Sequence, residues 1–153
     1  MQRNWNKDWR KSVIVLSGGF DPVHRGHLRM FREASWMGHQ VIVGLNSDEW
    51  LTRKKFHPFM KFEERKEIIE GFKYVNQVLS FDDTDDTASD VIFKVCSLYK
   101  KEDVDIYFAN GGDRTTDNVP EMDICKELGV EMLWGVGGGK IQSSSWLING
   151  EKK

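Results

Sequence analysis

The sequence predicts an α/β protein with a Rossmann-like, doubly wound sheet of about five parallel strands. Short apolar stretches, most of them rich in β-branched residues, alternate along the chain with stretches whose apolar residues recur at helical spacing. The connections between them are short, and several contain glycine. A parallel sheet with right-handed helical crossovers produces this alternation, because helices cover both faces of the sheet.

The elements are expected to form one domain over residues 12–150, after a basic N-terminal arm of residues 1–11. Strands are expected at 13–16, 40–45, 78–81, 104–109 and 130–134. Helical faces are expected to begin near residues 28, 49, 62, 91 and 122, with a last short helix after residue 145. Gly38 and Gly129 stand where these patterns place helix ends. The acidic stretch 82–87 is expected to be a solvated loop leading into a helix.

Composition excludes several classes of function. The net charge of −2 and the isoelectric point near 6.1 give no electrostatic basis for nucleic-acid binding. No apolar run has membrane-spanning length and no signal peptide is evident, so we expect a cytoplasmic protein without a membrane partner. Two cysteines in 153 residues do not form a disulfide framework.

Residues 13–27 combine a strand, a glycine loop and the start of a helix. Backbone N–H groups and a helix N-terminus then meet at one point, where an anion is stabilised. His24 and His27 lie there and can donate hydrogen bonds to phosphate oxygens. Two other interpretations stay open: the rings are satisfied within the loop, or they share a metal ion. No third ligand stands nearby at suitable spacing, so we predict no protein-held metal.

The segment 18–27, Gly-Gly-Phe-Asp-Pro-Val-His-Arg-Gly-His, resembles the signature of the HxGH nucleotidyltransferase superfamily, in its cytidylyltransferase-like branch. The resemblance implies that His24 and His27 stabilise charge at the α-phosphate by hydrogen bonding and by their own charge. It also implies a lysine from the loop after the second strand. The spacing to the following Glu-Arg pair favours Lys54, with Lys55 in reserve.

The resemblance continues along most of the chain. Residues 43–48 look like the family's second strand and turn, 110–114 like its Gly-Gly-Asp loop facing base and ribose, and 141–147 like its last motif. The implied nucleotide-binding residues are Gly18, Gly19, Phe20, Gly26, Gly112, Asp113, Ser143, Ser144 and Ser145. The implied acceptor- or phosphate-binding residues are Asp21, Lys55, Arg65 and Arg114. Arg65 is also open to a simpler interpretation as a surface arginine in a helix ion-pair network.

The implied activity is transfer of a nucleoside monophosphate from ATP or CTP, with Mg²⁺, to a small phosphorylated acceptor, releasing pyrophosphate. Gly112-Asp113-Arg114, and the absence of an arginine shortly before Ser143, resemble the sugar-phosphate nucleotidyltransferases of the ADP-heptose type more than glycerol-3-phosphate cytidylyltransferases. The choice between ATP and CTP stays open.

A regulatory module that binds nucleotide without catalysis would show the same alternation, but it would not need both histidines. The family also implies a homodimer, for which the aromatic residues Trp50, Phe56 and Phe59 are candidates at an apolar interface.

Overall fold

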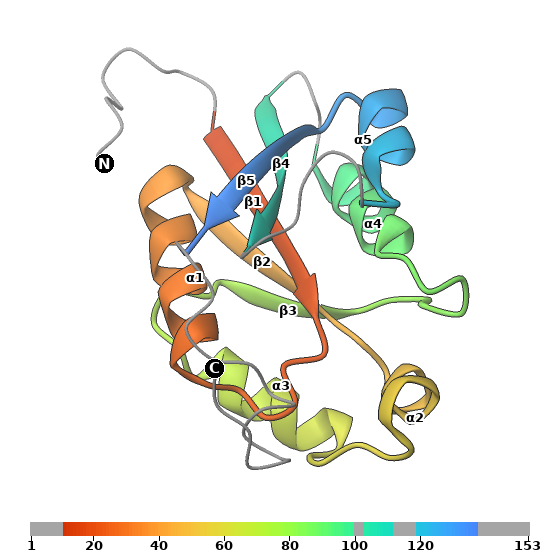
Figure 1. The fold of residues 1–153 in the computed structure, drawn as a ribbon. Coiled ribbons are helices and arrows are strands. Elements are labelled where there is room, and N and C mark those ends of the chain that lie inside the picture. The colour runs from red at the N-terminus through yellow and green to blue at the C-terminus, as the bar shows by residue number, and fades with distance from the viewer. Residues whose placement is uncertain (1–10, 100–102, 112–118, 138–153) are drawn as a thin grey trace.

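A computed structural model describes residues 11–99, 103–111 and 119–137, and within them five parallel strands form one sheet. The strand order is β3-β2-β1-β4-β5, and every neighbouring pair is parallel. The strands are β1 (Lys11–Gly18), β2 (Gln40–Leu45), β3 (Gln77–Ser80), β4 (Val104–Gly111) and β5 (Glu131–Val136). The predicted fold class is confirmed (Figure 1).

Helices cover both faces of this sheet, as Figure 1 shows. They are α1 (Arg25–Met37), α2 (Asp48–Lys55), α3 (Phe62–Glu70), α4 (Ser89–Leu98) and α5 (Met122–Leu128). Alternate residues of β1 point to opposite faces, as the period of a strand requires. Ile14 and Leu16 pack in the cluster that contains Phe31 of α1, whereas Val13 and Val15 pack in the cluster that contains α4 and α5.

The order of the strands places the candidate site at the carboxyl edge of the sheet. After β3 the chain crosses to the other side of β1, so that β1 and β4 are neighbours at the point where the strand order reverses. Ligands of open α/β sheets bind in the crevice outside the carboxyl ends of the strands at such a reversal. The loop between β1 and α1 lies at this edge (Figure 1).

The first helix ends at Gly38, as predicted, but for a different reason from the usual left-handed cap. Gly38 has φ −146°, which is extended backbone. A Cβ atom there would lie 2.5 Å from Cγ1 of Ile14. The glycine is therefore required by the close approach of the helix end to β1, whereas Gly129, with φ 71°, is the left-handed cap expected for α5.

Three local expectations need correction. The basic residues 53–55 lie in the last turn of α2 rather than in a loop, where their charge complements the helix dipole. The fifth strand extends to Val136, so Gly135 belongs to it. In the acidic stretch, Asp83 is buried instead of solvated, because its carboxylate accepts hydrogen bonds from the turn after β2.

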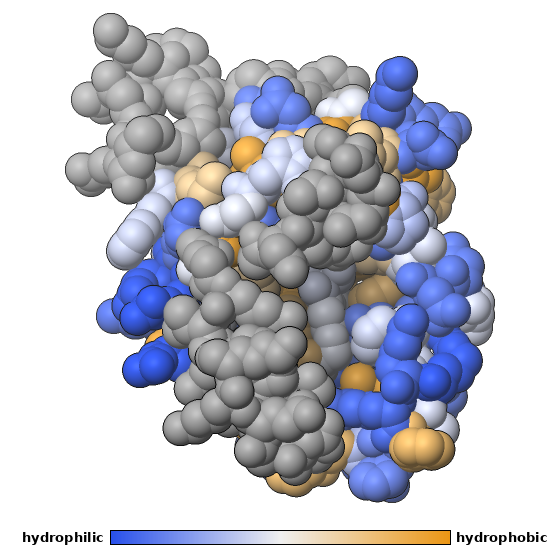
Figure 2. All heavy atoms as spheres, viewed as in Figure 1, coloured by the Kyte–Doolittle hydropathy of each residue, from blue (hydrophilic) through white to orange (hydrophobic). Residues whose placement is uncertain are grey.

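Other expectations fall wholly or partly outside the described residues. These are residues 1–10 of the arm, the site residues Gly112, Asp113, Arg114, Ser143, Ser144 and Ser145, and the last short helix. Lys11, assigned to the arm, is the first residue of β1. Within the described part of the chain, no helix is both long and apolar enough to cross a bilayer. Among the coloured residues of Figure 2, hydrophilic ones predominate and hydrophobic ones form small separate groups.

Candidate active site

The end of β1 and the loop after it are tightly packed, which explains Gly18 and Gly19. A Cβ atom at Gly18 would lie 3.0 Å from the ring of Phe20, and one at Gly19 would lie 2.9 Å from Leu51. Phe20 itself is buried and has φ 49°, a left-handed conformation that non-glycine residues rarely adopt. Such strain persists where surrounding packing holds it, often at functional sites.

His24 and His27 form a capping box at the first turn of α1. The Nδ1 atom of His24 accepts a hydrogen bond from the Gly26 N–H at 3.0 Å, and Nδ1 of His27 accepts one from the His24 N–H at 3.2 Å. The two rings stack with centroids 3.8 Å apart. Because each Nδ1 is an acceptor, each neutral ring carries its hydrogen on Nε2. The capping contacts therefore fix the tautomer of both rings.

His27 is neutral in the ligand-free protein. Burial, and second the neighbouring His24, lower the pKa of His27 to about 3. The edge-to-face contact with Phe20, with centroids 4.7 Å apart, supplies part of the apolar surroundings. In the ligand-free state the ring of His27 therefore offers a neutral Nε2–H donor, and its predicted contribution of charge at the α-phosphate stays a prediction.

Phe20 and Asp21 support the histidine loop through buried contacts. Phe20 is only 4% exposed and packs against His27 and Phe31. The buried carboxylate of Asp21 accepts hydrogen bonds from the N–H groups of Phe59 and Met60, each at 2.6 Å. Asp21 therefore fastens the α2–α3 connection to the histidine loop, and both residues act here through packing and anchoring. Their predicted contacts with substrate stay untested.

The two candidate lysines differ in position. Lys54 lies over the ring of Trp50, with Nζ 5.4 Å from its centroid, and this ring approaches Gly19. Lys55 Nζ donates to the backbone oxygen of Asp21 and lies 3.2 Å from its carboxylate. Lys55 is therefore the lysine that contacts the histidine loop directly, although the sequence favoured Lys54.

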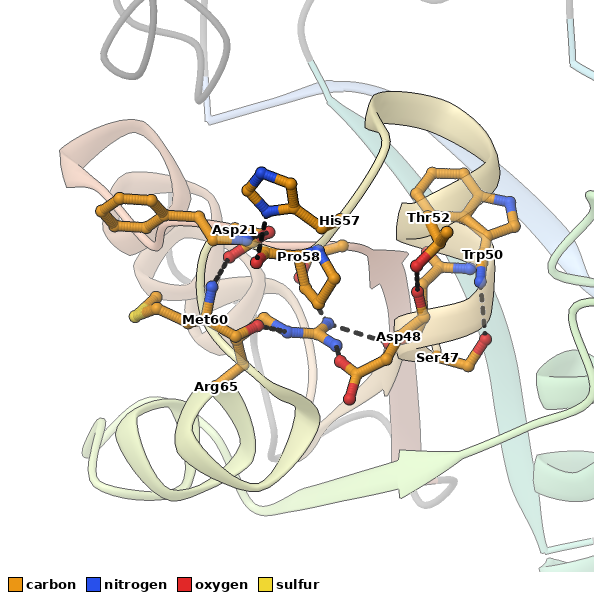
Figure 3. A network of polar contacts seen from close by, with 12 residues as sticks. Asp21, Ser47, Asp48, Trp50, Thr52, His57, Pro58, Met60 and Arg65 are labelled. Carbon is orange, nitrogen blue, oxygen red and sulfur yellow. Dashed lines mark hydrogen bonds and ion pairs between the residues drawn. The ribbon is translucent and has the colours of Figure 1, made fainter.

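Arg65 is completely buried, which differs from both interpretations of the sequence. Its guanidinium donates to the backbone oxygens of Met60, Gly19 and Asn46 and forms an ion pair with Asp48 at 2.7 Å. Figure 3 shows it between Met60 and Asp48. All three guanidinium nitrogens donate to protein oxygens, and the side chain holds three connections of the chain together at the carboxyl edge.

Sequence reasoning missed the contribution of Asp83. Its carboxylate accepts hydrogen bonds from Asn46 Nδ2, from the Ser47 N–H and from the Ser47 hydroxyl, at 2.8–3.1 Å. The Ser47 hydroxyl also accepts from the Trp50 N–H and so caps α2. Asp83 therefore fixes the start of α2. Its role could not be inferred from the sequence, because it is one of several acidic residues in the stretch 82–87.

No cluster of three or more histidine, cysteine, aspartate or glutamate side chains suited to a metal ion occurs in the described ranges. Both oxygens of the Asp21 carboxylate, the one nearest to the histidines in sequence, are already hydrogen-bonded to backbone N–H groups. The Asp21 carboxylate is thus engaged in holding the α2–α3 connection.

Comparisons with known proteins identify the family. The model of the cytidylyltransferase-like family matches residues 15–136. Among curated proteins, the bifunctional protein HldE of Gluconobacter oxydans is 32% identical over 154 residues, covering 96% of this chain and 29% of HldE. The glycerol-3-phosphate cytidylyltransferase of Bacillus spizizenii is 30% identical over 94 residues, covering 61% of this chain and 67% of that enzyme. The chain thus spans less than a third of HldE.

Solved structures with low sequence identity share the fold. A bifunctional NMN adenylyltransferase/ADP ribose pyrophosphatase from Francisella tularensis superposes with a TM-score of 0.66 at 17% identity, covering 94% of this chain and 44% of that one. A lipopolysaccharide core biosynthesis protein from Thermoplasma volcanium superposes with a TM-score of 0.62 at 19% identity, covering 82% and 94%.

Proposed function

Because the chain belongs to the cytidylyltransferase-like family, we propose that it transfers a nucleoside monophosphate from ATP or CTP to a small phosphorylated acceptor. An acceptor phosphate oxygen attacks the α-phosphorus, the bond from that phosphorus to the bridging oxygen breaks, and pyrophosphate leaves. The acceptor phosphate is already ionised near pH 7, so the reaction needs no protein nucleophile. The protein's task is alignment and stabilisation of the charge that develops.

The stacked pair of histidines, of which His27 is neutral, is the observation that carries this proposal. Both rings have a fixed tautomer with the hydrogen on Nε2, and both lie at the first turn of α1, where the helix dipole also favours an anion. Donors held in place before the reaction stabilise a transition-state charge without the cost of reorganisation. A module that only binds nucleotide would not require two such donors.

Mg²⁺ is expected to reach this site as the complex with the triphosphate. Mg²⁺ commonly retains waters and binds through substrate phosphates with one or two carboxylates. Among the carboxylates near the histidines, Asp21 is hydrogen-bonded through both oxygens to backbone N–H groups. The proposed roles of the protein's own residues are to bind and orient the nucleotide and the acceptor.

The acceptor is proposed to be a sugar phosphate, ahead of glycerol 3-phosphate. The Gly112-Asp113-Arg114 sequence and the match to HldE over most of this chain support the first choice. The matches to glycerol-3-phosphate and ethanolamine-phosphate cytidylyltransferases support the second class of acceptor, a polyol or amino-alcohol phosphate.

A pyrophosphate-release screen tests the proposed reaction. The full chain is incubated with Mg²⁺ and each of ATP, CTP, GTP and UTP, crossed with a panel of phosphorylated sugars, polyols and amino alcohols. We expect turnover with ATP or CTP and a sugar phosphate. Turnover only with CTP and glycerol 3-phosphate would reverse the choice of acceptor. Nucleotide binding without pyrophosphate release from any pair would contradict catalysis and support the regulatory module.

A pair of lysine variants then tests which lysine serves the reaction. We expect Lys55→Ala to reduce kcat by about 10², because it removes a cation fixed against the histidine loop. Lys54→Ala, the matched control on the next residue, is expected to change kcat by less than about threefold, within the range of a weak surface interaction. Equal losses in both variants would contradict the preference for Lys55.

We also propose a homodimer. Phe56 is 91% exposed and Phe59 is 61% exposed on the connection that Asp21 holds against the site. Hydrophobic residues protrude in the region of α2 and α3 at the lower edge of Figure 2. Trp50, the third predicted member, is only partly exposed because it packs near Gly19.

A further inference from the structure

Asn110 lies at the carboxyl end of β4, in the strand next to β1 at the reversal of strand order. Its side chain is 1% exposed. The pairing of β4 with β5 shifts register between Ala109 and Gly111, so that Asn110 lies within the irregularity. Its Nδ2 donates a hydrogen bond to the Leu133 carbonyl oxygen at 3.2 Å. That bond fixes the orientation of the amide, since an amide oxygen cannot donate to a carbonyl.

The other end of this amide has no partner. Among the buried side-chain nitrogen and oxygen atoms of the described residues, only Oδ1 of Asn110 lacks a hydrogen bond. Buried polar side chains are satisfied in the large majority of cases, and each exception requires an explanation. Asn76 shows the ordinary situation for an amide oxygen, because its Oδ1 accepts a hydrogen bond from the Val41 N–H at 2.8 Å.

The position of this acceptor relative to the histidines suggests its role. Once the phosphates lie at the α1 N-terminus, the nucleoside extends along the carboxyl ends of the strands. On the β2 side, that edge is filled by Arg65 and Asp83 with their protein partners. The β4 side presents the unpaired oxygen of Asn110. β1 and β4 are neighbours at the reversal of strand order, the place outside whose carboxyl ends ligands of open α/β sheets bind.

We propose that Oδ1 of Asn110 accepts a hydrogen bond from an N–H or O–H donor on the nucleoside half of the triphosphate, and so determines nucleotide specificity. The donor is the exocyclic amino group of cytosine or adenine, or a ribose hydroxyl. Sites built to hydrogen-bond a substrate discriminate strongly against analogues without the donor, because their own buried group is then left unpaired. This inference rests on the proposed function for the location of the phosphates.

Calorimetric binding measurements with nucleotide analogues test the inference without relying on turnover. For whichever of ATP or CTP binds, wild type is compared with a base analogue without the amino group (ITP or UTP) and with the 2′-deoxy and 3′-deoxy triphosphates. We expect one of these analogues to bind at least about tenfold more weakly. The analogue that loses affinity identifies the base or the ribose as the donor.

The variant Asn110→Leu, similar in size and without an acceptor, should bind the full nucleotide at least about tenfold more weakly and lose the discrimination between it and the analogue. Asn76→Leu is the control, because Asn76 Oδ1 accepts from Val41 at the opposite end of β2. This variant should discriminate as wild type does. Thermal unfolding reports whether each variant folds. If Asn110→Leu does not fold, the comparison of analogues with the wild-type protein still tests the inference.

Equal binding of all analogues by wild type, or unchanged discrimination in folded Asn110→Leu, would overturn the inference. Discrimination that depends on Asn110, without pyrophosphate release in the screen, would contradict the proposed transfer reaction and leave this inference intact. Pyrophosphate release, combined with a discrimination between analogues that does not depend on Asn110, would support the transfer reaction and overturn this inference.

Discussion

His27 serves two purposes with the two nitrogens of one ring. Its Nδ1 accepts from the His24 N–H and caps α1, whereas Nε2–H is the donor assigned to the phosphates. Substitution by alanine removes both and cannot separate a folding defect from a loss of catalysis. Two substitutions separate these roles. The amide of asparagine reaches the position of Nδ1, whereas the amide of glutamine reaches the position of Nε2.

We expect His27→Asn to keep the stability of wild type within about 0.5 kcal/mol, because an acceptor for the cap remains. Its kcat should fall by about 10²–10³, the usual loss for one preorganised donor. His27→Gln should show the reverse pattern, with about 1 kcal/mol lower stability and a smaller loss of kcat. Urea unfolding and pyrophosphate release measure the two effects. Loss of kcat in both variants in proportion to stability would contradict the division of roles.

The depressed pKa of His27 also predicts a dependence of stability on pH. The pKa is about 3 in the folded protein and 6.5 for an ordinary histidine, so between these values the unfolded chain binds a proton that the folded chain does not. The free energy of unfolding therefore rises with pH across this window and is lost as the pH falls. The contribution has a slope of at most about 1.4 kcal/mol per pH unit. His27→Asn should flatten this slope between pH 6 and pH 4, as measured by urea unfolding.

At the scale of elements, Arg65 joins three connections of the chain. From the start of α3 it reaches Gly19 after β1, Asn46 after β2 and Asp48 at the start of α2. With the bond to Met60 these are four hydrogen bonds, all donated by a side chain that is completely buried. A planar guanidinium carries five N–H donors in a rigid fork, whereas a lysine ammonium has three donors clustered at one nitrogen on a flexible stem.

We expect Arg65→Lys to lower the free energy of unfolding by about 2–4 kcal/mol, because buried carbonyl groups lose their donor. Arg53→Lys is the matched control: Arg53 donates to Asp83 and Asp86, but its side chain is 40% exposed. Its loss should stay below about 1 kcal/mol. The urea midpoints of unfolding of the two variants are compared with that of wild type. An equal decrease in both would contradict a special contribution of the buried hydrogen bonds of Arg65.

At the scale of the whole molecule, the proposed dimer is a prediction about the exposed α2–α3 connection. Light scattering at micromolar concentration should show a species of twice the 17.8 kDa chain. The double variant Phe56→Ser, Phe59→Ser should shift it to the monomer without loss of helix content, because both side chains are exposed in the single chain. Trp36→Ser, which removes a 49% exposed aromatic residue on α1, is the control. Only a 17.8 kDa species for wild type would contradict the dimer.

Local signals in the sequence were sufficient for the fold class and for the histidine motif. β-branched runs, helical spacing and the Ser47 cap act between residues a few positions apart, so they can be read from the chain in order. The predicted strand at 40–45 and the predicted helix closed by Gly129 agree with β2 and α5. The histidines at the start of α1 are likewise set by a strand, a glycine loop and a helix that are contiguous in sequence.

Tertiary structure alone decided what each site residue contacts. Arg65 meets Gly19 across 46 positions, Asp83 meets Asn46 across 37, and Lys55 meets Asp21 across 34. No periodicity or spacing reports such pairs. The neutral state of His27 depends on burial beside Phe20, and the unpaired oxygen of Asn110 depends on an irregular pairing of β4 with β5. These properties arise from desolvation and from contacts between distant segments, which exist only once the chain has folded.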